Sequence, residues 1–307
     1  MSDWEFIKHR TAADGAVWRS TDGGFYKRTG DHTVKEEADF QRRAAELGYP
    51  VPQIVADGIE EGRHFFTERS LGEVSLHDAA LTGAGGQVAD SVIEAAAAIS
   101  GRLLEAQART ALPAGPQRVR AWVRQAGFTD NVFAENPDLD TPRVHAALDE
   151  VVERLSGVAM CHSHLDYGLP NAFTTGVIDW QHHGLAPLGY DVYPMLDIVA
   201  FKGGGKGYRL TPAQRAHYLT ALDEVATGAY GCPLSGYLAD FLLVKCLFFL
   251  ALMRPVDVSR HDKRLKWHYR RALAQMGLEH YASTTTIDTA TFPTLAQFTA
   301  TFAPTAP

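Results

Sequence analysis

Three oxygen-bearing side chains stand near the middle of the chain at spacings that could serve a transfer reaction. Asp166 is followed by Asn171, and an apolar pair of residues then leads to Asp179. A carboxylate can orient a hydroxyl group and accept its proton, whereas carboxylate and amide oxygens can hold Mg²⁺ against a polyphosphate. These residue types are the ones that phosphoryl transfer to a hydroxyl requires. Asp166 fits the first role, and Asn171 and Asp179 fit the second.

Each of these residues alone has a plainer explanation, because Asp often caps a loop and Asn often lies in a turn. The joint spacing is more informative. An H-x-D-x-x-x-x-N segment followed by two apolar residues and an Asp matches the catalytic loop and metal-binding Asp of protein kinases. His164, the first residue of that segment, is expected to brace the loop by a hydrogen bond rather than to act as a base.

In these segments the sequence resembles the aminoglycoside phosphotransferase and choline kinase-like family, which consists of small-molecule kinases with a protein-kinase-like fold. The resemblance rests on segments 164–171, 178–180 and 187–191 and, upstream in the family's order, on Lys27, Glu37 and the turn 48–52. The sequence departs from the family pattern at Leu165, where the family has Gly. It also departs from the pattern in the loop 11–15, which holds a single Gly.

The resemblance implies a nucleotide site between two lobes. Lys27, on a strand, would hold the α- and β-phosphates and pair with Glu37 on the following helix. Segment 67–72 would join the lobes and receive the adenine, with Ser70 as the best match for the contacting residue. ATP is the implied donor, with GTP left open, and Mg²⁺ is the implied metal.

The acceptor is expected to be a small molecule with a hydroxyl group. The short span between residues 180 and 191, without an A-P-E element, leaves no room for the segment on which protein kinases lay their peptide. The resemblance favours an aminoglycoside-like or other antibiotic, as in resistance or self-protection. A nucleoside, a sugar or a choline-like alcohol is the alternative.

Residues near the catalytic loop are expected to line this acceptor site. Carboxylates such as Asp166 and Asp197 would complement the amines of a cationic acceptor. The other expected lining residues are Tyr167, Gln181, His182 and His183.

Two other classes of function could use the same part of the chain. His162, His164 and Asp166 also begin a metallohydrolase pattern, and His182 and His183 could supply further ligands for zinc or iron. That pattern leaves the Asn and the second Asp without roles. A non-catalytic nucleotide-binding protein is the other alternative, but such proteins usually lose a residue of the catalytic set, which is complete here.

The elements that must position these residues change in character near Gly72. Before it, short aromatic and β-branched runs between turn residues predict strands, and an Ala/Glu/Arg-rich stretch after Thr33 predicts a helix that carries Glu37. After it, apolar residues recur at helical spacing, apart from an embedded loop and hairpin at 158–180. The predicted strands are 4–10, 16–20, 25–28, 53–59 and 64–68, and the predicted helices include 33–47, 89–109, 117–125 and 144–155.

These elements predict an α+β, two-lobed, protein-kinase-like fold with a small β-rich N-terminal lobe and a larger helical C-terminal lobe. The expected divisions are a nucleotide-binding lobe with its hinge at 1–72, a helical lobe with the catalytic loop and acceptor site at 73–282, and a Thr-rich C-terminal segment at 283–307.

The composition is that of a globular protein. The 307 residues include 29 Lys and Arg against 36 Asp and Glu, a net charge of −7. This balance argues against nucleic acid or an anionic membrane as the main partner. Three cysteines without CxxC spacing predict neither a disulfide framework nor a thiolate metal site. The N-terminus lacks a signal-peptide pattern and Lys245 interrupts the longest apolar run, so a cytoplasmic location is expected.

Overall fold

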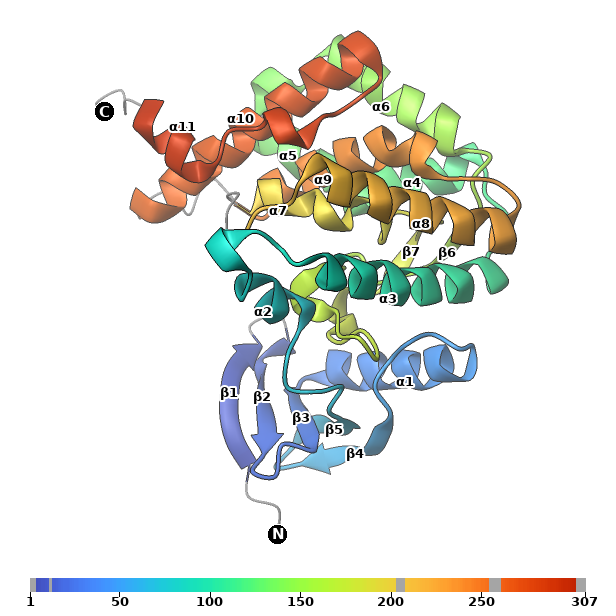
Figure 1. The fold of residues 1–307 in the computed structure, drawn as a ribbon, viewed down its shortest axis with the longest axis vertical. Helices are drawn as coiled ribbons and strands as arrows, with labels where there is room; N and C mark the ends of the chain where they lie inside the picture. Colours follow the sequence, from blue (N-terminus) through green and yellow to red (C-terminus); the bar gives the residue numbers. More distant parts are fainter. Residues whose placement is uncertain (1–3, 11–12, 203–207, 254–260, 302–307) are drawn as a thin grey trace.

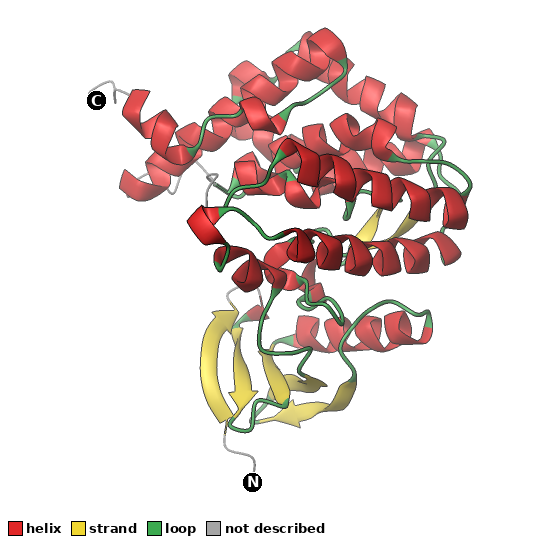
Figure 2. Ribbon diagram, viewed as in Figure 1, coloured by secondary structure: helices red, strands yellow, loops and turns green. Residues whose placement is uncertain are grey.

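The computed structural model describes residues 4–10, 13–202, 208–253 and 261–301. These residues form one lobe built on a five-stranded sheet and a larger lobe built mainly of helices (Figure 1, Figure 2). The predicted two-lobed α+β fold is therefore confirmed.

The sheet of the N-terminal lobe is antiparallel throughout, with its strands in the order β1-β2-β3-β5-β4. Asp22 and Gly23 close the hairpin between the second and third strands, where Gly23 has φ 73° and Asp22 accepts a hydrogen bond from the Gly24 N–H (2.9 Å). The strands are β1 (Trp4–Arg10), β2 (Gly15–Ser20), β3 (Phe25–Gly30), β4 (Ile54–Glu60) and β5 (Arg63–Arg69).

Helix α1 (His32–Glu46) packs against the sheet and the helical lobe at once. Its residue Val34 belongs to a small core with Phe66 of the sheet. Phe40 and Ala44, further along the same helix, belong to the main core of the C-terminal lobe. The position of α1 therefore fixes the sheet relative to the helical lobe.

Long helices that pack side by side make up most of the C-terminal lobe, with α3 along α8 and α9 along α10 (Figure 1). A two-stranded sheet of β6 (Met160–Ser163) and β7 (Gly184–Pro187) lies among them and carries the loop of interest between its strands. The helices are α2 (Leu76–Leu81), α3 (Asp90–Arg109), α4 (Pro116–Ala126), α5 (Thr129–Glu135), α6 (Pro142–Leu155), α7 (Ile198–Phe201), α8 (Pro212–Tyr230), α9 (Leu238–Ala251), α10 (His261–Thr284) and α11 (Leu295–Thr301).

The C-terminal segment packs on the helical lobe as far as Thr301. Phe292 is buried, with its ring centre 5.7 Å from that of Phe201. Asp197 accepts a hydrogen bond from Thr289 and forms an ion pair with Arg215. The expectation that Asp197 complements a cationic acceptor is therefore corrected, because this carboxylate is buried and already neutralised inside the fold.

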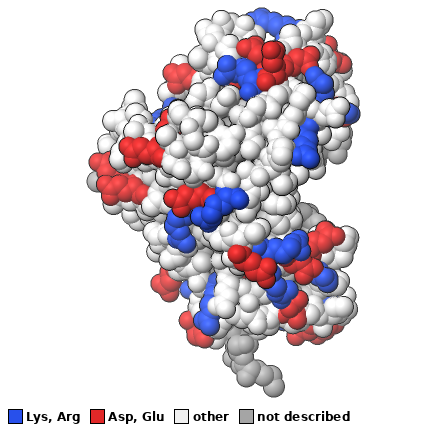
Figure 3. Space-filling view, turned by 90° about the vertical axis from the view of Figure 1, so that its right-hand side faces the viewer, with Lys and Arg blue, Asp and Glu red and all other residues white. Residues whose placement is uncertain are grey.

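The outer surface carries charges of both signs. On the face shown in Figure 3, basic and acidic side chains are interspersed and neither sign forms a continuous patch. In the part of the chain that the structure describes, no single helix has the length and apolar character of a membrane span. One pair of segments satisfies those criteria together, by length and composition only, and is sharply bent between its two parts, Pro212–Tyr230 and Ser235–Ala251.

Candidate functional site

The loop between β6 and β7 brings together the three oxygen-bearing residues on which the sequence analysis began. The Asn171 side chain donates a hydrogen bond to the Asp166 carbonyl (3.0 Å). The Asn171 carbonyl accepts from the Ile178 N–H (2.9 Å), because the chain returns in a tight hairpin between these residues. Asp179, the next residue, is thereby set beside Asn171.

A buried carboxylate fixes the start of this loop. Asp191 accepts hydrogen bonds from the N–H groups of His164 (2.7 Å) and Leu165 (3.0 Å) and from the Gln107 side chain (2.8 Å). The His164 ring forms a hydrogen bond with the Ile178 carbonyl (2.8 Å) on the other arm of the hairpin. His164 therefore has the bracing contact that the sequence predicts.

Leu165, which stands where the family pattern has Gly, keeps a left-handed backbone with φ 66°. Such a conformation costs an L-residue about 1–2 kcal/mol. The Leu165 carbonyl accepts a hydrogen bond from the buried Lys245 ammonium (2.9 Å). The same ammonium lies 4.0 Å from the centre of the Tyr190 ring. Burial lowers the pKa of Lys245 to about 8, an effect that Asp191 and Asp166 oppose. Leucine thus adopts at this position a backbone conformation that favours glycine.

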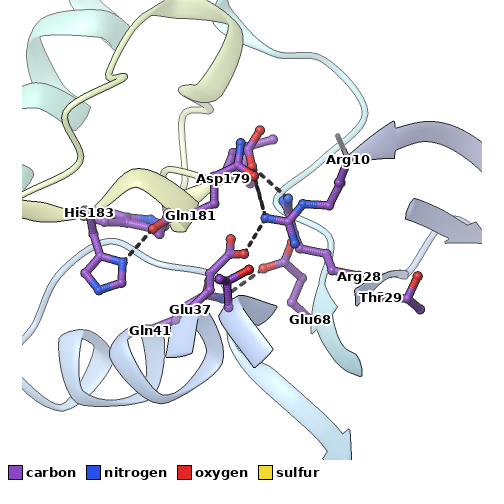
Figure 4. A network of polar contacts seen from close by, with 12 residues as sticks. Arg10, Arg28, Thr29, Glu37, Gln41, Glu68, Asp179, Gln181 and His183 are labelled. Carbon is purple, nitrogen blue, oxygen red and sulfur yellow. Dashed lines mark hydrogen bonds and ion pairs between the residues drawn. The ribbon is translucent and has the colours of Figure 1, made fainter. Parts of the chain in front are cut away.

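Three basic residues of the N-terminal lobe surround Asp179, of which Figure 4 shows Arg10 and Arg28. Its carboxylate lies 3.1 Å from Arg28, 3.3 Å from Lys8 and 4.0 Å from Arg10. Burial alone would favour the protonated acid, but Arg28, Lys8 and Arg10 hold the pKa of Asp179 well below its usual range. Asp179, whose own φ is 69°, is therefore ionised and strained, as is common at functional sites.

A network of buried ion pairs holds two of these bases in place (Figure 4). Arg10 pairs with Glu37 of α1 (2.6 Å), and Arg28 pairs with Glu68 of β5 (2.8 Å). Gln41 of α1 donates a further hydrogen bond to Glu68 (2.9 Å). Burial raises the pKa of Glu37, although Arg28 and Arg10 oppose this effect. Helix α1 thus positions the cations that face Asp179.

The expected ion pair between Lys27 and Glu37 is not formed, and this prediction is wrong. Lys27 pairs with Glu60 and lines a hollow of about 540 Å³ beside Trp18, on the other face of the sheet. The reason is strand geometry, because adjacent residues of a strand point to opposite faces. Arg28, one residue later, points toward α1 and Asp179.

The segment that would receive the adenine forms the end of β5 and the connection to α2. The Ser70 N–H donates to the Gly24 carbonyl (2.9 Å), and the Ser70 hydroxyl donates to the Gly72 carbonyl (3.2 Å). Ser70 therefore lies between the lobes as expected, while its contact with a nucleotide stays a prediction. In the loop 11–15, residues 11 and 12 lie outside the described residues.

Two of the residues expected at the acceptor site are used inside the fold. Tyr167 is buried, its hydroxyl is hydrogen-bonded to Ser100 (2.9 Å), and burial raises its pKa. Gln181 accepts a hydrogen bond from Arg10 (2.9 Å) and so faces the N-terminal lobe. Burial corrects the expectation for Tyr167, whereas an acceptor contact by Gln181 stays a prediction.

The histidines that follow Trp180 do not line the cavity that Asp166 borders. His183 stacks on Phe40 of α1, with ring centres 3.8 Å apart, and His182 is exposed. Among the described residues no three His, Cys, Asp or Glu side chains meet as a metal-binding group. An acceptor contact by these histidines stays a prediction, whereas the described residues do not form the alternative metallohydrolase arrangement.

Asp166 borders a cavity of about 360 Å³ in the helical lobe. Its walls come from α7, α9, α10 and α11 and include Phe201, Phe249 and Arg270. Sequence reasoning missed these residues because they carry no motif and meet only through packing. Arg28, also missed, could have been found from the alternation of β3 together with the helix that covers one face of the sheet.

A β-rich lobe on a helical lobe, with an H-x-D-x-x-x-x-N loop and an ionised Asp facing the sheet, defines a kinase-type phosphotransferase. The chain belongs to the phosphotransferase enzyme family, whose model matches residues 12–229. Comparison with curated proteins found no match.

Solved structures of similar fold agree with this assignment. One is a protein of Ralstonia eutropha JMP134, described as a candidate aminoglycoside phosphotransferase, at 16% identity and TM-score 0.60, covering 92% of this chain and 93% of that one. Another is a thermostable mutant of APH(4)-Ia in complex with ADP and hygromycin B, at 18% identity and TM-score 0.54, covering 89% of this chain and 94% of that one. At these identities the likeness establishes the fold.

Proposed function

We propose that this protein transfers the γ-phosphoryl group of ATP, with Mg²⁺, to a hydroxyl group of a small molecule. The observation that carries the proposal is the position of the β6–β7 loop, which presents Asp166 to a cavity and Asp179 to the bases of the sheet. Donor and acceptor would then approach the loop from opposite sides, as in-line transfer requires.

The residues present fit a Mg²⁺-bound nucleotide. Asp179 is an ionised carboxylate, and Asn171 uses its amide N–H inside the loop, which leaves its amide oxygen to face a cation. Hard oxygen donors of this kind suit Mg²⁺, which would neutralise charge on the phosphates when bound. The buried Nε and Nη1 of Arg10 have no partner among the described residues and could donate to phosphate oxygens.

On the acceptor side, the Asp166 carboxylate would accept a hydrogen bond from the attacking hydroxyl and then its proton. The Asn171 side chain donates a hydrogen bond to the backbone carbonyl of Asp166. This contact therefore orients Asn171 and also fixes the backbone of the proposed base.

We expect Arg28, rather than Lys27, to act on the nucleotide phosphates. Arg28→Gln should raise the KM for ATP roughly tenfold or more, because the guanidinium would make charge-assisted hydrogen bonds to the nucleotide phosphates. Lys27→Gln, the matched control one residue away, should change it less than about twofold, because an exposed ion pair contributes little. Steady-state kinetics with ATP as the varied substrate tests this, and an effect of Lys27→Gln as large as that of Arg28→Gln would contradict it.

A coupled assay of ADP release tests the proposed function. Activity should require Mg²⁺, should be lost with EDTA, and should depend on a hydroxylated small molecule. The acceptor panel should span aminoglycosides, which the family resemblance favours, as well as nucleosides, sugars, amino alcohols and hydroxy acids. Phosphorylation of peptides without phosphorylation of any small molecule would refute the proposal.

A further inference from the structure

The cavity beside Asp166 is basic. Lys202, Lys266 and Arg270 contribute to its walls, and Asp166 is the only acidic residue among the described residues that line it. A polycationic acceptor would bring its ammonium groups against three like charges, which is unfavourable. The charge of this cavity is thus opposite to the one expected for an aminoglycoside site.

Arg270 is the most informative of these bases. Its guanidinium donates to the Phe249 carbonyl (3.1 Å) and lies 5.6 Å from the centre of that ring. No carboxylate among the described residues pairs with it. Burial lowers the pKa of Arg270 to about 10. Lys266, exposed and one helical turn earlier on α10, points into the same cavity.

The rest of the wall is largely apolar. The rings of Phe201 and Phe249 are stacked, with centres 5.2 Å apart and planes inclined by 5°. Tyr269 also lines the cavity, and its hydroxyl donates a hydrogen bond to the Ala200 carbonyl (2.8 Å). A ligand therefore meets one carboxylate, several cations and aromatic surface between them.

Resting on the proposed function, we infer that the acceptor is an alcohol that carries an anionic group and an apolar body. Its hydroxyl would meet Asp166, its carboxylate or phosphate would bind Arg270 and Lys266, and its apolar part would lie against the aromatic wall. A planar guanidinium binds either anion through two parallel hydrogen bonds, so both anions share the same recognition chemistry.

A matched set of small alcohols tests this inference. The first set shares a phenyl group and a hydroxyl and consists of the anion phenyllactate, the neutral phenylpropanediol and the cation phenylalaninol. The second set compares glycerol 3-phosphate with glycerol and tests phosphate as the anionic group. We expect kcat/KM for the anionic member of each set to exceed that of its neutral and cationic counterparts at least tenfold. Titration calorimetry on Asp166→Asn protein with a bound ATP analogue reads the same preference without turnover.

Substitutions on α10 link the preference to the cavity. Arg270→Gln should lower kcat/KM for the anionic probes roughly tenfold to a hundredfold, the loss expected for a charge-assisted hydrogen bond, and leave the neutral diol within about twofold. Arg264→Gln removes the same charge from an exposed position outside the cavity. It should change kcat/KM neither for the anionic probes nor for the neutral diol. Lys266→Gln, at an exposed site that the fold does not need, should give a smaller loss of the same kind.

The outcomes separate this inference from the proposed function. Slow Mg²⁺-dependent ATP hydrolysis that is lost in Asp166→Ala tests the phosphotransferase itself and needs no acceptor. If that hydrolysis occurs but the probes bind equally, or the cationic alcohol is preferred, the inference is overturned and the proposed function stands. Equal effects of Arg270→Gln and Arg264→Gln would also overturn it.

Discussion

Asp166→Asn should lower kcat by a factor of about a thousand or more, with nucleotide affinity nearly unchanged. The amide has almost the shape of the carboxylate but cannot accept the hydroxyl proton, and general-base catalysis is worth roughly 10²–10⁴. Turnover at saturating acceptor gives the first quantity, and calorimetric titration with an ATP analogue gives the second.

Asp149→Asn, on the exposed face of α6, is a suitable control because it removes the same charge far from the loop. It should leave both quantities unchanged. If Asp166→Asn retained most of its activity, the base assignment would fail and proton transfer to the phosphate itself would have to be considered.

Asp179→Asn should abolish productive binding of Mg²⁺ and nucleotide, and it should also destabilise the protein. The substitution removes the proposed metal ligand and takes from Arg28, Lys8 and Arg10 the anion they surround. Breaking a buried ion pair from one side costs about 3–5 kcal/mol. Because its pKa is depressed in the folded state, the stabilisation by Asp179 is present above pH 3.8, the unfolded-state pKa, and is lost as the pH falls through the folded-state pKa.

Two measurements check this second prediction. Urea denaturation at neutral pH gives the loss of unfolding free energy, and a thermal shift on adding Mg²⁺ and ATP, expected for the native protein, should be absent in Asp179→Asn. The Asp166→Asn protein should keep that shift, which distinguishes the two carboxylates. A native-like shift in Asp179→Asn would refute its assignment as a metal ligand.

Much of the fold follows from local patterns in the sequence. The predicted strand 4–10 coincides with β1, and the predicted helix 89–109 differs from α3 by one residue. These elements are predictable because alternation and helical spacing are properties of a few neighbouring residues. The start of α1 shows the limit, since the helix begins one residue before the predicted 33, where the Asp31 side chain caps it by accepting a hydrogen bond from the Thr33 N–H (2.9 Å).

The candidate site is predictable where one short segment supplies it and not where distant segments meet. Asp166, Asn171 and Asp179 lie on a single loop, so their spacing sufficed. Whether Lys27 or Arg28 faces α1 depends on which face of the sheet the helix covers, which is a tertiary property. The cavity wall requires four helices to converge, and no local pattern encodes that convergence.

The left-handed backbone of Leu165 bears on how this loop can change in evolution. Glycine would relieve about 1–2 kcal/mol of strain there, but it would stabilise the unfolded chain by about 0.4–1 kcal/mol through added conformational freedom. The second term offsets about half of the first while Asp191 and Lys245 hold the two peptide groups beside the residue. We therefore expect substitutions at positions 165 and 245 to have non-additive effects on the free energy of unfolding, because the Lys245 ammonium holds the Leu165 carbonyl.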